Sequence, residues 1–119
     1  MNKSIALNPR FPNWIYFGLS FYHYRKGDYE SALEAGLKIE WLAFHWTYLY
    51  RAAAYGQLGR IEEAEAAAAK LLEIYPDYAD KAWEDFQIHN ITDEALAHFA
   101  EGLSKAGLDI RTTPPEPTN

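Results

Sequence analysis

Histidine and cysteine are the residue types that most often bind metals or perform nucleophilic chemistry. The chain contains four histidines, His23, His45, His89 and His98, and no cysteine. No pair of histidines has the H-x-x-x-H or H-E-x-x-H spacing that would turn two rings toward one metal ion from a helix. Without cysteine, thiolate nucleophiles, Cys-ligated zinc and disulfides are excluded. The sequence therefore predicts no metal site, and we expect His23 to be a packing residue with a hydrogen-bond partner.

Carboxylates are the second candidates for chemistry. Glu62, Glu63 and Glu65 cluster beside the alanine run 66–69. Alanine favours helix, so the cluster is expected to lie on a solvated helix face, whereas acid–base catalysis needs a carboxylate pair in a cleft. The chain has no Gly-rich phosphate loop and no G-x-S-x-G motif. We therefore expect no catalytic residue, no cofactor and no small-molecule substrate; the protein is predicted not to be an enzyme.

Composition and charge limit the remaining classes. The chain has 119 residues, of which 49% are hydrophobic, enough for the core of one small domain. The formal net charge of −6 argues against nucleic acid and anionic lipid as partners. No run of 18 apolar residues is present, and Asn8, Pro9, Arg10 and Pro12 interrupt any signal-peptide core. The expected location is the cytoplasm.

An internal repeat in the sequence predicts the helices that would position any functional site. Gly27 corresponds to Gly59, an offset of 32 residues from 27 to 59, and Ala32 corresponds to Ala64 at the same offset. In each unit a helical stretch ends at the glycine, and a second helix follows with the alanine where two helices must approach closely. Glycine at a helix C-terminus favours the left-handed conformation that stops the helix. Asp28 is placed to cap the following helix.

This pattern resembles the tetratricopeptide repeat (TPR). The second unit matches the family pattern through a series of eight residues: Tyr48, Ala52, Tyr55, Gly59, Ile61, Ala64, Ala68 and Pro76. The first unit matches through Tyr16, Leu19, Ser20, Gly27, Tyr29 and Ala32, but has His23 in place of the usual Tyr, lacks the closing Pro and falls short of the usual length of about 34 residues. The resemblance implies an all-α, right-handed α-solenoid of about three antiparallel helix pairs.

The third pair is expected to be degenerate and to cap the array. A helix is predicted from about Tyr78 to Ile88, a turn at Asn90, and a last helix that starts at Thr92 and ends at Gly107. The predicted organisation is a lead-in over residues 1–12, a helical domain over 13–108 and a disordered tail over 109–119. Its repeats cover about 13–44, 45–78 and, in degenerate form, 79–108.

One aromatic stripe exceeds what a helix pair needs for its own packing. Trp14, Phe17, Phe21 and Tyr24 are spaced by three or four residues and so share one helix face. In the TPR pattern this face lines the concave groove. The resemblance implies four further groove residues: Arg25, Trp46, Leu49 and Trp83. Because leaving several aromatic residues wet costs several kcal/mol, we expect either a partner on this stripe or coverage of it by the third unit or by the chain before Ile5.

The groove residues favour an apolar or aromatic-rich protein segment as the ligand. Phe17 and Phe21 stand where TPR domains that clamp a terminal carboxylate carry Lys and Asn, so we do not expect that clamp here. The predicted function is a non-catalytic protein–protein interaction module that binds a peptide, a partner domain or a second copy. The alternative is a regulatory or dimerising tail of a larger enzyme, because the run from Asp77 to Leu108 also resembles the C-terminal TPR region of bacterial class III adenylate/guanylate cyclases.

Overall fold

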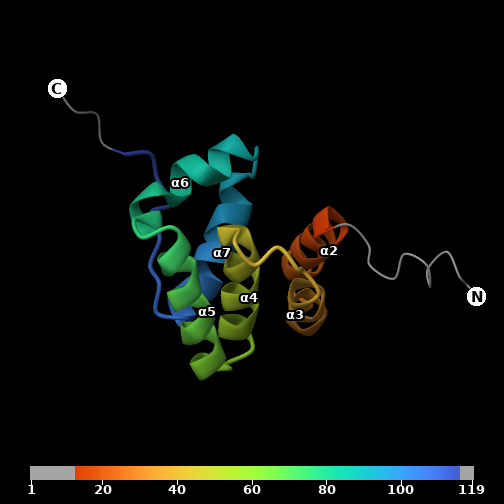
Figure 1. Cartoon of the computed structure of the whole chain (residues 1–119). Helices are drawn as coiled ribbons and strands as arrows, with labels where there is room; N and C mark the ends of the chain where they lie inside the picture. Colours follow the sequence, from red (N-terminus) through yellow and green to blue (C-terminus); the bar gives the residue numbers. More distant parts are fainter. Residues whose placement is uncertain (1–12, 116–119) are drawn as a thin grey trace, which may run out of the picture.

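The computed structural model describes residues 13–115, and every regular element in that range is an α-helix (Figure 1). The six helices are α2 (Asn13–Arg25), α3 (Tyr29–Leu37), α4 (His45–Gln57), α5 (Ile61–Ile74), α6 (Tyr78–Ile88) and α7 (Asp93–Lys105). The all-α prediction is confirmed for this range, and α6 has the bounds expected from the sequence. No helix within residues 13–115 is long and apolar enough to cross a membrane.

Turn residues end the helices where the sequence predicted. Gly27, Gly59 and Gly107 have φ angles of 82°, 77° and 85°, the left-handed region in which glycine has no side-chain penalty. Asn90, between α6 and α7, also has a positive φ, 58°. At the helix starts, the Asp28 side chain accepts a hydrogen bond from the backbone N–H of Ser31, and Thr92 accepts one from Ala95.

Two helix pairs form the body of the molecule, α2 with α3 and α4 with α5, and α3 packs on α4 to join them. Small residues let the helices of a pair come close: the buried Ser20 hydroxyl on α2 donates to the backbone oxygen of Ala32 on α3 at 2.9 Å. The connection between the pairs is fixed by Arg51 of α4, whose guanidinium donates to the carbonyls of Gly36 and Ile39 at 3.1 Å each.

The last helix does not pack as the second member of a third pair. Backbone contacts between α6 and α7 are few, whereas α7 lies along α4 and also reaches α5. The close approach depends on glycine: a Cβ atom added at Gly102 of α7 would lie 2.7 Å from the carbonyl oxygen of Ala53, and one added at Gly56 of α4 would meet the backbone of Gly102. The sequence predicts about three helix pairs with a degenerate last one; in the structure α7 packs on α4 instead of on α6, because two glycines allow this close contact.

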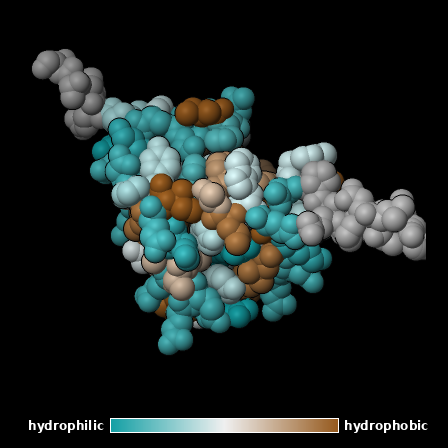
Figure 2. All heavy atoms as spheres, in the orientation of Figure 1, coloured by the Kyte–Doolittle hydropathy of each residue, from teal (hydrophilic) through white to brown (hydrophobic). Residues whose placement is uncertain are grey.

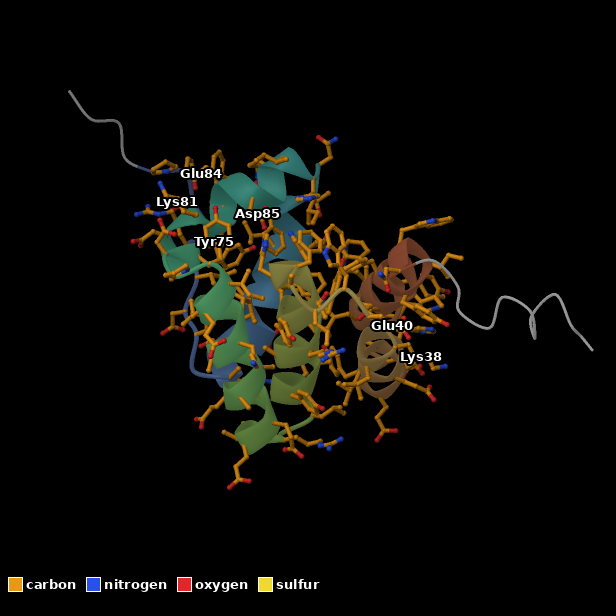
Figure 3. The ribbon with its side chains drawn as sticks, viewed as in Figure 1. Lys38, Glu40, Tyr75, Lys81, Glu84 and Asp85 are labelled. Atoms are coloured by element: carbon orange, nitrogen blue, oxygen red, sulfur yellow. The ribbon has the colours of Figure 1, made fainter. Side chains whose placement is uncertain are left out.

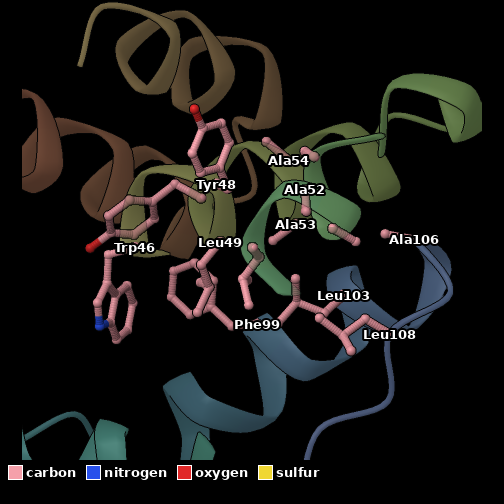
Figure 4. Close-up of a cluster of buried hydrophobic side chains, with 14 of the residues drawn as sticks. Trp46, Tyr48, Leu49, Ala52, Ala53, Ala54, Phe99, Leu103, Ala106 and Leu108 are labelled. Carbon is pink, nitrogen blue, oxygen red and sulfur yellow. The ribbon is translucent and has the colours of Figure 1, made fainter. Parts of the chain in front are cut away.

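The core is centred on this α4–α7 contact. Figure 4 shows Leu49 of α4 facing Phe99 and Leu103 of α7, and all three side chains are fully buried. Phe99 also stacks on Tyr24 of α2, with ring centroids 4.2 Å apart. The hydroxyl of Tyr24 donates to the backbone oxygen of His98 at 2.7 Å. The helix α7 therefore joins the first helix pair to the second.

The chain after α7 turns back toward the start of α6. Leu108 is buried, Ile110 packs against the core, and the backbone N–H of Arg111 donates to the carbonyl oxygen of Ala79 at 2.7 Å. The beginning of the predicted tail, 109–119, is thus held on the protein, because apolar residues 108 and 110 give it an anchor. The predicted lead-in, residues 1–12, and the last four residues lie outside the described residues.

Candidate functional site

An apolar pocket of about 580 Å³ lies between α2, α4 and the turn that joins α6 to α7. Aromatic side chains form much of its wall: Phe17 and Phe21 from α2, Phe44 from the residue before α4, and Trp46 and Tyr50 from α4. The Phe17 ring lies 5.6 Å from the ring centroids of both Phe44 and Tyr50. Phe17, Phe21 and Phe44 remain only half-buried. Figure 2 shows apolar residues gathered near the middle of one face of the molecule, among hydrophilic ones.

Apart from Ile91, the rest of the pocket wall is polar or small. Arg25 stands at the end of α2, and the α6–α7 turn contributes His89, Asn90, Ile91 and Thr92. Gly18 of α2 also lines the pocket, and a Cβ atom added there would meet nothing within 4 Å. The left-handed backbone at Asn90 reverses the chain between α6 and α7, which brings the turn against the aromatic wall.

A buried polar cluster holds α6 in place beside the pocket. The carboxylate oxygen Oδ2 of Asp85 lies 3.0 Å from Nε2 of His45 and accepts a hydrogen bond from the Tyr78 hydroxyl at 2.7 Å. Burial acts to raise the pKa of Asp85, but the hydrogen bonds from His45 and Tyr78 outweigh it, so the pKa lies below its ordinary value. Figure 3 labels Asp85 beside Tyr75, whose pKa is raised by burial and by that carboxylate. The cluster therefore connects α6 to α4 and to the end of α5.

A second polar contact lies on the side covered by α7. The Tyr29 hydroxyl is 2.8 Å from Nε2 of His98, and the His98 ring centroid lies 4.4 Å from that of Tyr24. Burial lowers the pKa of His98, which keeps this imidazole neutral near pH 7. No group of three or more His, Cys, Asp or Glu residues in the described part of the chain is placed to hold a metal ion.

The eight groove residues predicted from the sequence fall into three groups. Phe17, Phe21, Arg25 and Trp46 line the pocket together. Tyr24 and Leu49 are 1% and 0% exposed, so their side chains are not part of an open surface. They lie in the core with Phe99, because α7 covers that part of the α2–α4 face.

The two remaining tryptophans of the predicted groove lie elsewhere. Trp14 is 71% exposed and stands outside the pocket lining. Trp83 is half-buried and packs against the core.

Sequence reasoning missed six of the residues that line the pocket: Gly18, Phe44, His89, Asn90, Ile91 and Thr92. It assigned Asn90 only to a turn and Thr92 only to a helix start. The turn signal was present, but no periodic pattern in the sequence shows which helix a turn lies against. Tyr50 was considered only as a clamp position, where its aromatic ring argued against carboxylate binding.

Comparison with known proteins identifies no relative. No protein-family model matches the chain, and neither a curated protein nor a solved structure matches it. The geometry of the pocket is therefore the basis for the functional proposal.

Proposed function

We propose that this protein is a non-catalytic interaction module that binds an apolar or aromatic-rich protein segment in the aromatic pocket. The observation that carries the proposal is the pocket itself, in which half-buried Phe17, Phe21 and Phe44 surround about 580 Å³ of space. Full burial of a large apolar side chain is worth about 1.5–3 kcal/mol relative to exposure. A partner that covers these rings would recover part of that free energy, which is why open apolar concavities commonly serve as binding sites.

We infer that the module is built from TPR-like repeats. The equivalent glycines Gly27 and Gly59 have nearly the same left-handed φ, and the helices of the first pair approach closely at Ser20 and Ala32. Both features agree with the TPR pattern in residues 13–78. In this proposal, α7 occupies one half of the groove, in the place where a ligand would otherwise bind. The pocket is the other half, which remains open to a ligand.

A second function is favoured by a separate observation, the exposed aromatic end of α2. Trp14 and Trp41 are 71% and 51% exposed, and the side-chain oxygen of Asn13 accepts a hydrogen bond from the backbone N–H of Glu40 at 2.9 Å. This bond brings both tryptophans to the same end of the molecule. Such a surface suits contact with another domain or a second copy, as in a regulatory or dimerising tail of a multidomain enzyme such as a class III nucleotide cyclase.

Blocking the pocket tests the first function. The variant Gly18→Phe adds a ring at a position that lines the pocket and has open space around its Cβ, so the fold should be kept while the pocket is filled. We expect the variant to lose binding of an uncharged apolar probe, N-phenyl-1-naphthylamine, with an unchanged far-UV circular dichroism spectrum. The matched control is Tyr22→Ala on the same helix, because Tyr22 is 54% exposed and does not line the pocket.

The same variants distinguish the two functions. Equal probe binding by Gly18→Phe and the wild type would contradict the pocket proposal. A dimer in light scattering that Trp14→Ala converts to a monomer, with unchanged probe binding, would favour the exposed end of α2 as the functional surface.

A further inference from the structure

The indole N–H of Trp46 is an unsatisfied donor at the pocket wall. The Trp46 side chain is 4% exposed and lines the pocket, yet its Nε1 atom is buried without a hydrogen-bond partner. A buried tryptophan usually finds an acceptor for its N–H, because leaving a buried donor without a hydrogen bond is unfavourable. The neighbouring His89 ring, 5.4 Å from the Trp46 ring, has its Nδ1 atom 2.9 Å from the Asp85 backbone oxygen. Because Nε1 is closed to solvent, an acceptor from a ligand can reach this N–H only if the Trp46 ring turns toward the pocket as the ligand binds.

The charge of the pocket is opposite to that of the whole chain. The chain has a formal net charge of −6, but the pocket lining contains the guanidinium of Arg25 and no carboxylate. Arg25 already has a weak partner that a ligand would have to displace. Its Nη2 lies 3.9 Å from a carboxylate oxygen of Glu94, whose side chain is 88% exposed. An exposed pair of this kind contributes little to stability. A ligand carboxylate can therefore replace Glu94 at little cost.

We propose that the segment bound in this pocket combines an acidic residue with an apolar or aromatic residue close to it. The apolar side chain lies among Phe17, Phe44 and Tyr50, the carboxylate pairs with Arg25, and an oxygen of the segment accepts the Trp46 N–H once the ring has turned toward it. This inference rests on the proposed function and adds the ligand's chemistry to it. The aromatic wall alone would accept any apolar segment, whereas Arg25 and Trp46 select for an anion and for an acceptor.

Three tripeptides that differ in one residue test the inference. The probes are N-acetylated and C-terminally amidated Glu-Leu-Phe, Gln-Leu-Phe and Lys-Leu-Phe, titrated into the 15N-labelled full chain. The chain has four tryptophans, and the indole signal of Trp46 is identified by its absence from a Trp46→Phe spectrum. We expect the Glu peptide to shift the Trp46 signal, to leave those of the exposed Trp14 and Trp41 in place, and to bind about fivefold more tightly than the Gln peptide. The Lys peptide should bind least.

Substitution of Arg25 provides the matched control. Arg25→Gln should bring the Glu and Gln peptides to the same affinity, and Arg25→Lys should retain part of the preference, while circular dichroism shows the fold of both variants.

Each other outcome separates the two proposals. Equal binding of the three peptides with a shift of Trp46 would overturn the charge preference and leave the proposed pocket function intact. Shifts confined to Trp14 and Trp41 would overturn both and point to the end of α2. No shift by any peptide at millimolar concentration would overturn the inference, and retained binding of the uncharged probe N-phenyl-1-naphthylamine at the pocket would then show that the pocket still takes apolar ligands.

Discussion

The sequence predicts one continuous groove along α2 and α4, but in the structure one half of this face is covered and the other half is open. Around Tyr24, Leu49 and Gly56 the face is covered by α7, whereas around Phe17 and Trp46 it stays open as the pocket. Side-chain size explains the difference. The covered half has Ala53 and Gly56 on α4, which allow backbone contact, and the open half has large rings that hold the neighbouring chain away.

The comparison shows how one helical surface can both stabilise a fold and keep a site. The helix α7 supplies apolar contacts to the core, whereas the turn at Asn90 that precedes it leaves Phe17 and Phe21 half-buried. In this respect α7 acts in the covered half as a bound helix would act in a groove.

The largest expected effect comes from removing the centre of the covered half. Phe99 is fully buried and stacks on Tyr24, so Phe99→Ala should lower the free energy of unfolding by about 3–5 kcal/mol, close to the whole stability of a small domain. Urea denaturation followed by circular dichroism measures it. The control Ile88→Ala, at a side chain 76% exposed, should change stability by less than about 0.5 kcal/mol. Similar stability for both variants would mean that α7 is not a structural part of the core.

Two glycine-to-alanine changes sharpen the contrast between the halves. Gly102→Ala places a methyl group against the backbone of Ala53 and should destabilise the protein by about 1–3 kcal/mol. Gly18→Ala, in the middle of α2 with open space around it, should stabilise the protein by about 0.5–1 kcal/mol through helix propensity. Thermal unfolding of both variants measures the difference. The proposed contrast between the halves would be wrong if both substitutions changed the free energy of unfolding in the same direction.

A smaller, pH-dependent effect is expected in the covered half. Burial lowers the pKa of His98 below its ordinary value of 6.5, so the unfolded chain takes up the proton first. Stability should therefore be complete above pH 6.5 and fall as the pH drops below it; nearby Arg25 adds to this effect and Glu101 opposes it. Denaturation of the wild type and of His98→Gln across this range tests the expectation, which requires a weaker pH dependence in the variant.

The smallest effect is expected outside both halves. Trp14 is 71% exposed, so Trp14→Ala should leave the unfolding free energy within about 0.5 kcal/mol of the wild type. A loss of several kcal/mol in the same denaturation experiment would show that Trp14 is covered in solution, by a second copy or by another part of the chain.

Local signals in the sequence were sufficient to predict the helices, but not to predict which helices pack against one another. Gly27, Gly59 and the capping residues Asp28 and Thr92 act within a few positions of themselves, so their roles could be predicted. The contact of Tyr24 with Phe99 joins residues far apart in the chain, and nothing in the periodicity of either helix specifies it. The aromatic stripe was predicted as one surface, and the covering of its far end by α7 was only one of the alternatives.

The return of the chain to α6 determines where a group attached after α7 would lie relative to one attached at the start of α2. The described chain begins at Asn13 on α2 and ends beyond Arg111, whose backbone is bonded to Ala79, and Figure 1 shows these points on opposite sides of the molecule. Groups attached at positions 13 and 111 would therefore lie apart, with the helices between them. A pair of labels at these two positions would report on whether the helices keep this arrangement in solution.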